Sequence, residues 1–143
     1  MVFRRKRLPA ELQGSYDAFL LLVEPLERAK AALTESVPST RLPGRPLAET
    51  LLEFEEGLRE VREGMPAWRV PEVESAWLAA ETGLEDALDM AERLRLQAEI
   101  PVGFEALIGT IQDLLAPLEA FEDAEARFRA LRVSGPVRDP DPD

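Results

Sequence analysis

Acidic side chains recur at helical spacing in two neighbouring segments and could do chemistry together. The two groups are Glu55, Glu56 and Glu60, and Glu85, Asp86 and Asp89. Carboxylate oxygens are the ligands that Mg²⁺ prefers in proteins. If the two segments are facing helices, the groups suggest a magnesium site between them.

The spacing resembles that of all-α nucleotide pyrophosphohydrolases, which hold magnesium with Glu and Asp along facing helices. Two features depart from that pattern. Arg59 stands where an acid of the second turn would be wanted, and the heptad register places the remaining acids on outer faces. Those outward acids are Glu56, Glu60, Asp86 and Asp89. We therefore interpret the acids as a solvated surface and expect no metal site. A magnesium-dependent hydrolase is the alternative, and it requires pyrophosphate release that is lost in Glu56→Ala or Asp86→Ala.

The composition excludes several other classes of site. The 143 residues include no histidine and no cysteine, so the usual zinc ligands, a thiolate nucleophile and an axial haem histidine are all missing. Acid–base catalysis would need a strongly shifted carboxylate, lysine or tyrosine. The sequence also has no Gly-rich phosphate loop and no nucleophile elbow. We expect no cofactor and no enzymatic activity.

The elements that would position these residues are predicted to be helices. Apolar residues alternate at steps of three and four in four segments, and each segment opens with a proline followed within four residues by an acid. Both features are typical of amphipathic helices. The predicted helices cover 9–36, 46–65, 71–99 and 103–132. Their short connections favour an all-α, antiparallel, up-down-up-down four-helix bundle. The bundle would span 8–133, between a basic N-terminal tip (1–7) and an acidic, Pro-rich, disordered tail (134–143).

Interior prolines and glycines suggest how the helices pack. Pro25 and Pro117 fall at the same height of the first and fourth helices, on the predicted solvent side, where a proline curves a helix around its core. Paired kinks that enclose a small-ligand pocket are the alternative. Gly83 is expected to make room for the ring of Phe54, and Gly57 is expected level with Ala80.

Charge is distributed unevenly along the chain. The formal charge is −11, from 17 basic and 28 acidic residues, yet four of the basic residues stand among the first seven positions without an acid. This tip, Arg4, Arg5, Lys6 and Arg7, could bind a partner or stay solvated. The acidic body disfavours nucleic acid as a partner. No run approaches the roughly 20 apolar residues that span a bilayer, so we expect a soluble, cytoplasmic protein.

Surplus apolar residues are the main positive sign of function. Leu20, Leu21, Leu107 and Leu114 exceed what a four-helix core needs and could be buried in a homodimer. The other recognition candidates lie in two connections and are Arg41, Arg45, Trp68 and Arg69. We therefore expect a non-enzymatic protein-interaction or scaffold module, with a small-ligand-binding bundle as a further alternative.

Overall fold

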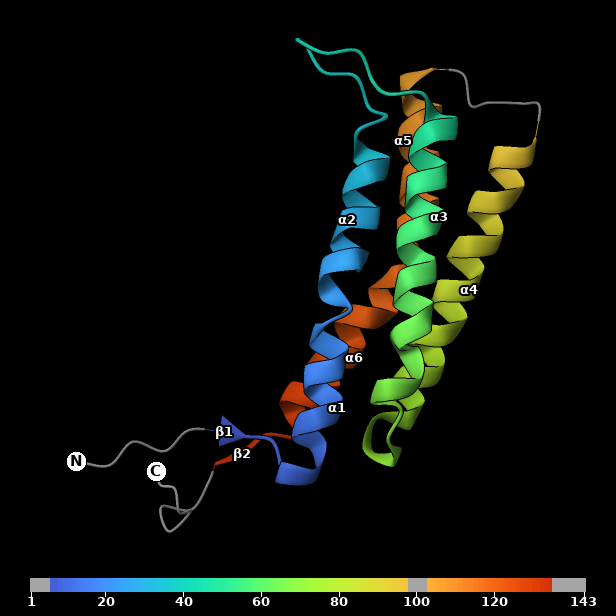
Figure 1. The fold of residues 1–143 in the computed structure, drawn as a ribbon. Helices are drawn as coiled ribbons and strands as arrows, with labels where there is room; N and C mark the ends of the chain where they lie inside the picture. Colours follow the sequence, from blue (N-terminus) through green and yellow to red (C-terminus); the bar gives the residue numbers. More distant parts are fainter. Residues whose placement is uncertain (1–5, 98–102, 135–143) are drawn as a thin grey trace.

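The computed structural model describes residues 6–97 and 103–134 as a bundle of helices (Figure 1). The α-helices are α1 (Ala10–Leu20), α2 (Val23–Thr34), α3 (Leu47–Gly64), α4 (Glu74–Leu96), α5 (Phe104–Leu115) and α6 (Glu119–Ala130). Three short 3₁₀ helices, η1 (Met65–Trp68), η2 (Pro71–Val73) and η3 (Ala116–Leu118), join or extend them. Two short strands, β1 (Lys6–Arg7) and β2 (Val133–Ser134), flank the helices.

The predicted all-α four-helix bundle is confirmed, with the first and last helices each broken near the middle. The chain runs up through α1 and α2, down through α3, up through α4, and down through α5, η3 and α6 (Figure 1). We call the end that holds β1, β2 and η1 the terminal end, and the end that holds the 35–46 connection the loop end. Among the described residues, no helix is both long and apolar enough to cross a membrane.

Prolines mark helix starts, as the sequence predicted. Pro9 and Pro46 are the N-cap residues of α1 and α3, and Pro71 is the first residue of η2. Proline suits these positions because the N–H groups of a first helical turn have no intrahelical partner to lose. Glu11, Glu49 and Glu72 follow in the first turns, where their charge favours the positive end of the helix dipole.

The core at the terminal end is an aromatic cluster centred on Trp68. The Trp68 ring meets Phe19 edge-on with centroids 4.9 Å apart, and Phe128 lies 6.1 Å away. Trp77 and Phe121 each lie 6.4 Å from Trp68. Trp68 is completely buried, so this predicted recognition residue is part of the core.

The break between α1 and α2 changes which residues face inward. The apolar steps of three and four along the first helix predict Val23 in the core, but Leu22 is buried and Val23 is 39% exposed. This rotation also carries Pro25 into the interior, so the prediction that it faces solvent is wrong. Pro25 has no N–H to offer the carbonyl of Leu21, its partner in a regular helix, and the break falls at this point.

Glycines lie opposite the backbone at both breaks, which differs from the predicted packing. A Cβ added at Gly83 would stand 2.1 Å from the carbonyl oxygen of Pro117, and one at Gly57 would stand 3.1 Å from that of Pro25. Neither Phe54 nor Ala80 is the neighbour that needs the space. Each proline-bearing helix therefore approaches a glycine of a neighbouring helix at backbone distance.

The fourth helix is rotated in the same way relative to its prediction. Leu114 is completely buried, so it is not surplus surface. The apolar steps of three and four along the fourth helix predict Phe104 and Leu115 in the core, but Phe104 is 57% exposed. Leu115 is only partly buried. The apolar arc is wide enough for either leucine to face inward, and the close contact between η3 and Gly83 selects Leu114.

The two strands bring both ends of the described chain together. Lys6 pairs with Ser134 and Arg7 with Val133 in an antiparallel ladder. The helical periodicity did not predict this pairing, because a two-residue strand has no detectable repeat. The remainder of the predicted tip and tail, 1–5 and 135–143, lies outside the described residues.

Candidate interaction surfaces

The predicted recognition residues do not form one site. Leu20 and Leu21 are exposed beside the first helix break, and Leu107 is partly buried on α5. Arg41 and Arg45 lie in the 35–46 connection at the loop end, while Arg69 follows η1 at the terminal end. Within the tip, the structure describes the backbone of Lys6 and Arg7, whereas Arg4 and Arg5 lie outside the described residues. The candidates are thus distributed over several surfaces.

Leu20, Leu21 and Val23 form an apolar surface at the first helix break, which we call the junction patch. Leu21 is 77% exposed, and its two neighbours in the patch are each 39% exposed. Asp17 and Glu24, both exposed, lie within four residues of the patch. An apolar surface with a polar rim is typical of protein interaction sites.

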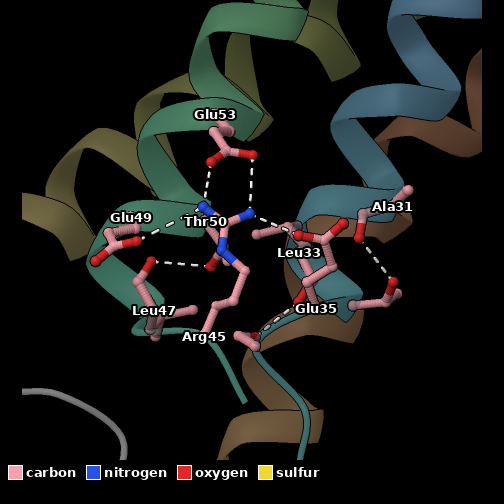
Figure 2. A network of polar contacts seen from close by, with 10 residues as sticks. Ala31, Leu33, Glu35, Arg45, Leu47, Glu49, Thr50 and Glu53 are labelled. Atoms are coloured by element: carbon pink, nitrogen blue, oxygen red, sulfur yellow. Dashed lines mark hydrogen bonds and ion pairs between the residues drawn. The ribbon is translucent and has the colours of Figure 1, made fainter. Parts of the chain in front are cut away.

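Arg45 fastens the 35–46 connection to the bundle (Figure 2). Its guanidinium donates to Glu35 of the connection at 2.6 Å and to both carboxylate oxygens of Glu53 on α3. Glu49 adds an ion pair at 3.6 Å, and the backbone N–H of Arg45 donates to the Glu35 carbonyl at 2.9 Å. Hydrogen bonds from Arg45 hold the pKa of the Glu53 carboxyl below its ordinary value. The cation is thus engaged within its own chain and acts as a structural clasp.

Arg69 is engaged in a similar way at the terminal end. It donates two hydrogen bonds to Glu74, at 3.1 and 2.7 Å, and its guanidinium carbon lies 4.1 Å from the centroid of the Trp77 ring. These hydrogen bonds lower the pKa of the Glu74 carboxyl. Arg69 therefore stabilises the turn between α3 and α4, although its side chain remains partly exposed.

Glu55 is a buried carboxylate, which the outward-facing interpretation of the acids missed. Arg95 on α4 donates to both of its oxygens, at 2.6 and 3.0 Å, and Arg59 donates at 3.2 Å. The hydrogen bonds to Glu55 raise the pKa of Arg95. Arg59, at helical spacing, was the one visible signal of pairing. Arg95 lies 40 residues from Glu55, too far along the chain for a local pattern to reveal.

The other acids tested for metal binding are exposed, as predicted. Glu60 pairs with Arg28 at 2.5 Å, Glu85 with Arg62 at 3.4 Å and Asp89 with Arg93 at 2.8 Å. Among the described residues, no three acidic side chains are grouped closely enough to hold a metal ion. Glu60, Glu85 and Asp89 thus form separate ion pairs along the bundle surface.

An open groove lies where α4 passes the second helix break. It has a volume of about 750 Å³, and α4, α5 and η3 contribute its walls. The small-ligand alternative requires an enclosed pocket between the bent helices, and this groove is broad and open to solvent. Its shape suits a segment of another chain better than an enclosed small molecule.

Comparison of the chain with protein-family models, with curated proteins and with solved structures finds no significant match.

Proposed function

We propose that the protein is a non-enzymatic, cytoplasmic interaction module that binds a protein partner or a second copy of itself through the junction patch. The observation that supports this proposal is the exposure of three apolar side chains that lie close together in the sequence, Leu20, Leu21 and Val23. Fully burying a leucine side chain contributes about 1.5–3 kcal/mol, and Leu21, which is 77% exposed, can still gain most of this contribution from a partner.

The packing around the patch supports this role. Leu22 is buried between two exposed neighbours, which fixes the backbone beneath the patch. A partner would therefore meet a surface that is already ordered and would lose little conformational entropy there. The exposed acid Asp17 favours a partner with basic residues around an apolar centre, whereas Glu24 is already paired with Arg28 at 3.1 Å.

The test compares a variant of the patch with a control variant at an exposed leucine elsewhere. Leu20→Glu/Leu21→Glu places charge in the patch, whereas Leu52→Glu changes a leucine on α3 that is 42% exposed. We expect the first variant to lose self-association in sedimentation velocity, or to lose a partner that purified wild-type protein binds in calorimetry. The Leu52→Glu control should keep both. Equal behaviour of all three proteins, in both measurements, would contradict the proposal.

A further inference from the structure

The groove between α4 and the second helix break has an apolar floor long enough for a short peptide. Leu78, which is 44% exposed, and Met90 lie at its two ends along α4. Twelve residues separate them, or about 18 Å of helix. A four-residue extended segment spans about 13 Å and fits within this length. Ala79 and Ala116 also belong to its lining, so a bound backbone could approach these small side chains closely.

The polar groups of the groove favour a cationic occupant. The carboxylates of Asp86 and Asp113 belong to its lining. Within the described residues, no arginine or lysine lies within ion-pair distance of either carboxylate. In a regular helix, the backbone carbonyl of Asp113 would accept a hydrogen bond from the N–H of residue 117. Because this residue is Pro117, it has no N–H to donate. The groove thus presents several acceptors, and a guanidinium group with its planar set of donors complements them.

One segment of this chain combines the required chemistry. Val2 and Phe3 are apolar, and Arg4 and Arg5 follow them directly. We propose that the groove binds residues 2–5 of a second copy of this chain, with Val2 and Phe3 against the apolar floor and the arginines on Asp86 and Asp113. This inference rests on the proposed function, because it names one protein contact that the module would make.

Residues 2–5, which we call the arm, cannot place their arginines on Asp113 of their own molecule. Lys6 pairs with Ser134 at the terminal end. Asp113 lies 17 residues above Ala130 along the fourth helix, a rise of about 25 Å. From Lys6 to Arg4 the chain spans at most about 7 Å, and the arginine side chain adds a similar length. The arginines of one copy can therefore meet Asp113 only in another copy.

The electrostatics give this contact a recognisable signature. Both copies carry a formal charge of −11, so they repel at long range and attract only where arm and groove meet. The attraction between the arginines and the two carboxylates is screened by salt. Association should therefore weaken as ionic strength rises, unlike association through an apolar patch.

Charge reversal in the full-length chain tests the inference. We expect sedimentation velocity to show association at about 50 mM salt and weaker association at about 500 mM. Arg4→Glu/Arg5→Glu and Asp86→Lys/Asp113→Lys should each weaken it about tenfold or more. All four substitutions together should restore it. The control Glu63→Lys/Asp123→Lys adds the same charge to exposed sites outside the groove and should not weaken association.

A second measurement locates the contact directly. A photo-crosslinking residue in place of Phe3, in a mixture of isotopically light and heavy chains, should join the arm of one copy to α4 of the other. A strictly monomeric chain up to about 1 mM, or crosslinks confined to single chains, would overturn the inference. So would association that Leu20→Glu/Leu21→Glu abolishes but the arm and groove variants leave unchanged, and this last result would leave the proposed function standing.

Discussion

At the scale of individual residues, two buried tryptophans differ in the hydrogen bonding of their indole N–H groups. The indole N–H of Trp77 donates to the Met65 carbonyl at 2.8 Å. The indole N–H of Trp68 is buried and has no hydrogen-bond acceptor among the described residues. An unsatisfied buried donor costs about 1–3 kcal/mol, so the two residues contribute unequally to stability.

This difference predicts unequal effects of the same substitution. Trp68→Phe leaves a small cavity but removes the unpaired donor, so we expect a change in unfolding free energy of less than about 1 kcal/mol. Trp77→Phe leaves a similar cavity, strands the Met65 carbonyl and weakens the contact with Arg69, so it should cost about 2–3 kcal/mol. Urea denaturation measures both. Equal losses would show that the Trp68 N–H has a partner, such as a bound water.

Interior glycines give a second prediction at this scale. At Gly83 a methyl group would collide with the Pro117 carbonyl, whereas at Gly14 nothing lies within 4 Å of the added atom. We expect Gly83→Ala to destabilise the protein by about 3 kcal/mol and Gly14→Ala to stabilise it by about 1 kcal/mol. Thermal unfolding of the two variants shows whether each substitution stabilises or destabilises the protein. A neutral Gly83→Ala would mean that the second break can move away from α4.

At the scale of elements, the buried carboxylate of Glu55 links α3 to α4 near the loop end. Arg95→Met would leave Glu55 with Arg59 alone, and a buried carboxylate deprived of a main partner costs about 3 kcal/mol or more. Arg93→Met, which breaks an exposed pair with Asp89, should be nearly neutral. Chemical denaturation separates the two cases. The double variant Glu55→Met/Arg95→Met should recover part of the loss, because apolar side chains often replace a buried ion pair without cost.

The helices themselves were largely predictable, but their rotations were not. Steps of three and four identified the buried stripe of α3 and η1, from Leu51 to Trp68, correctly. Where apolar residues surround a helix, as from Phe19 to Val23, the pattern does not determine which leucine faces inward. Backbone contacts at Gly57 and Gly83 fix the rotation instead, and these depend on residues distant in sequence.

Some features of the candidate surfaces could be predicted from the sequence, and others could not. Exposure of Leu20 and Leu21 followed from their excess over the core stripe. The ion pairs of Arg45 and Arg69 with carboxylates of their own chain could not be predicted, because an exposed arginine in a connection suits an interface equally well. The groove was also hidden, because it arises only where the second break meets α4.

At the scale of the whole molecule, ion pairs between helices and connections make stability depend on pH. Arg45 and Arg69 lower the pKa values of Glu53 and Glu74 from the ordinary value of 4.5. A carboxyl with a depressed pKa in the folded state stabilises that state above its unfolded pKa, and the contribution is lost as pH falls through the folded pKa. We expect the urea concentration at the midpoint of unfolding to decrease as the pH is lowered below about 4.5. The decrease should be less steep in Arg45→Gln/Arg69→Gln. Identical pH profiles would contradict a stabilising role for the two clasps.

The aromatic cluster around Trp68 has a consequence for how unfolding can be observed. Both tryptophans, Trp68 and Trp77, lie towards the terminal end, whereas the contact between Glu55 and Arg95 lies towards the loop end. Intrinsic fluorescence therefore reports on one half of the bundle, while far-ultraviolet circular dichroism averages over both. If the loop end opens first, the dichroism signal will decline before the emission shifts. A difference between the two curves would thus identify the half that frays.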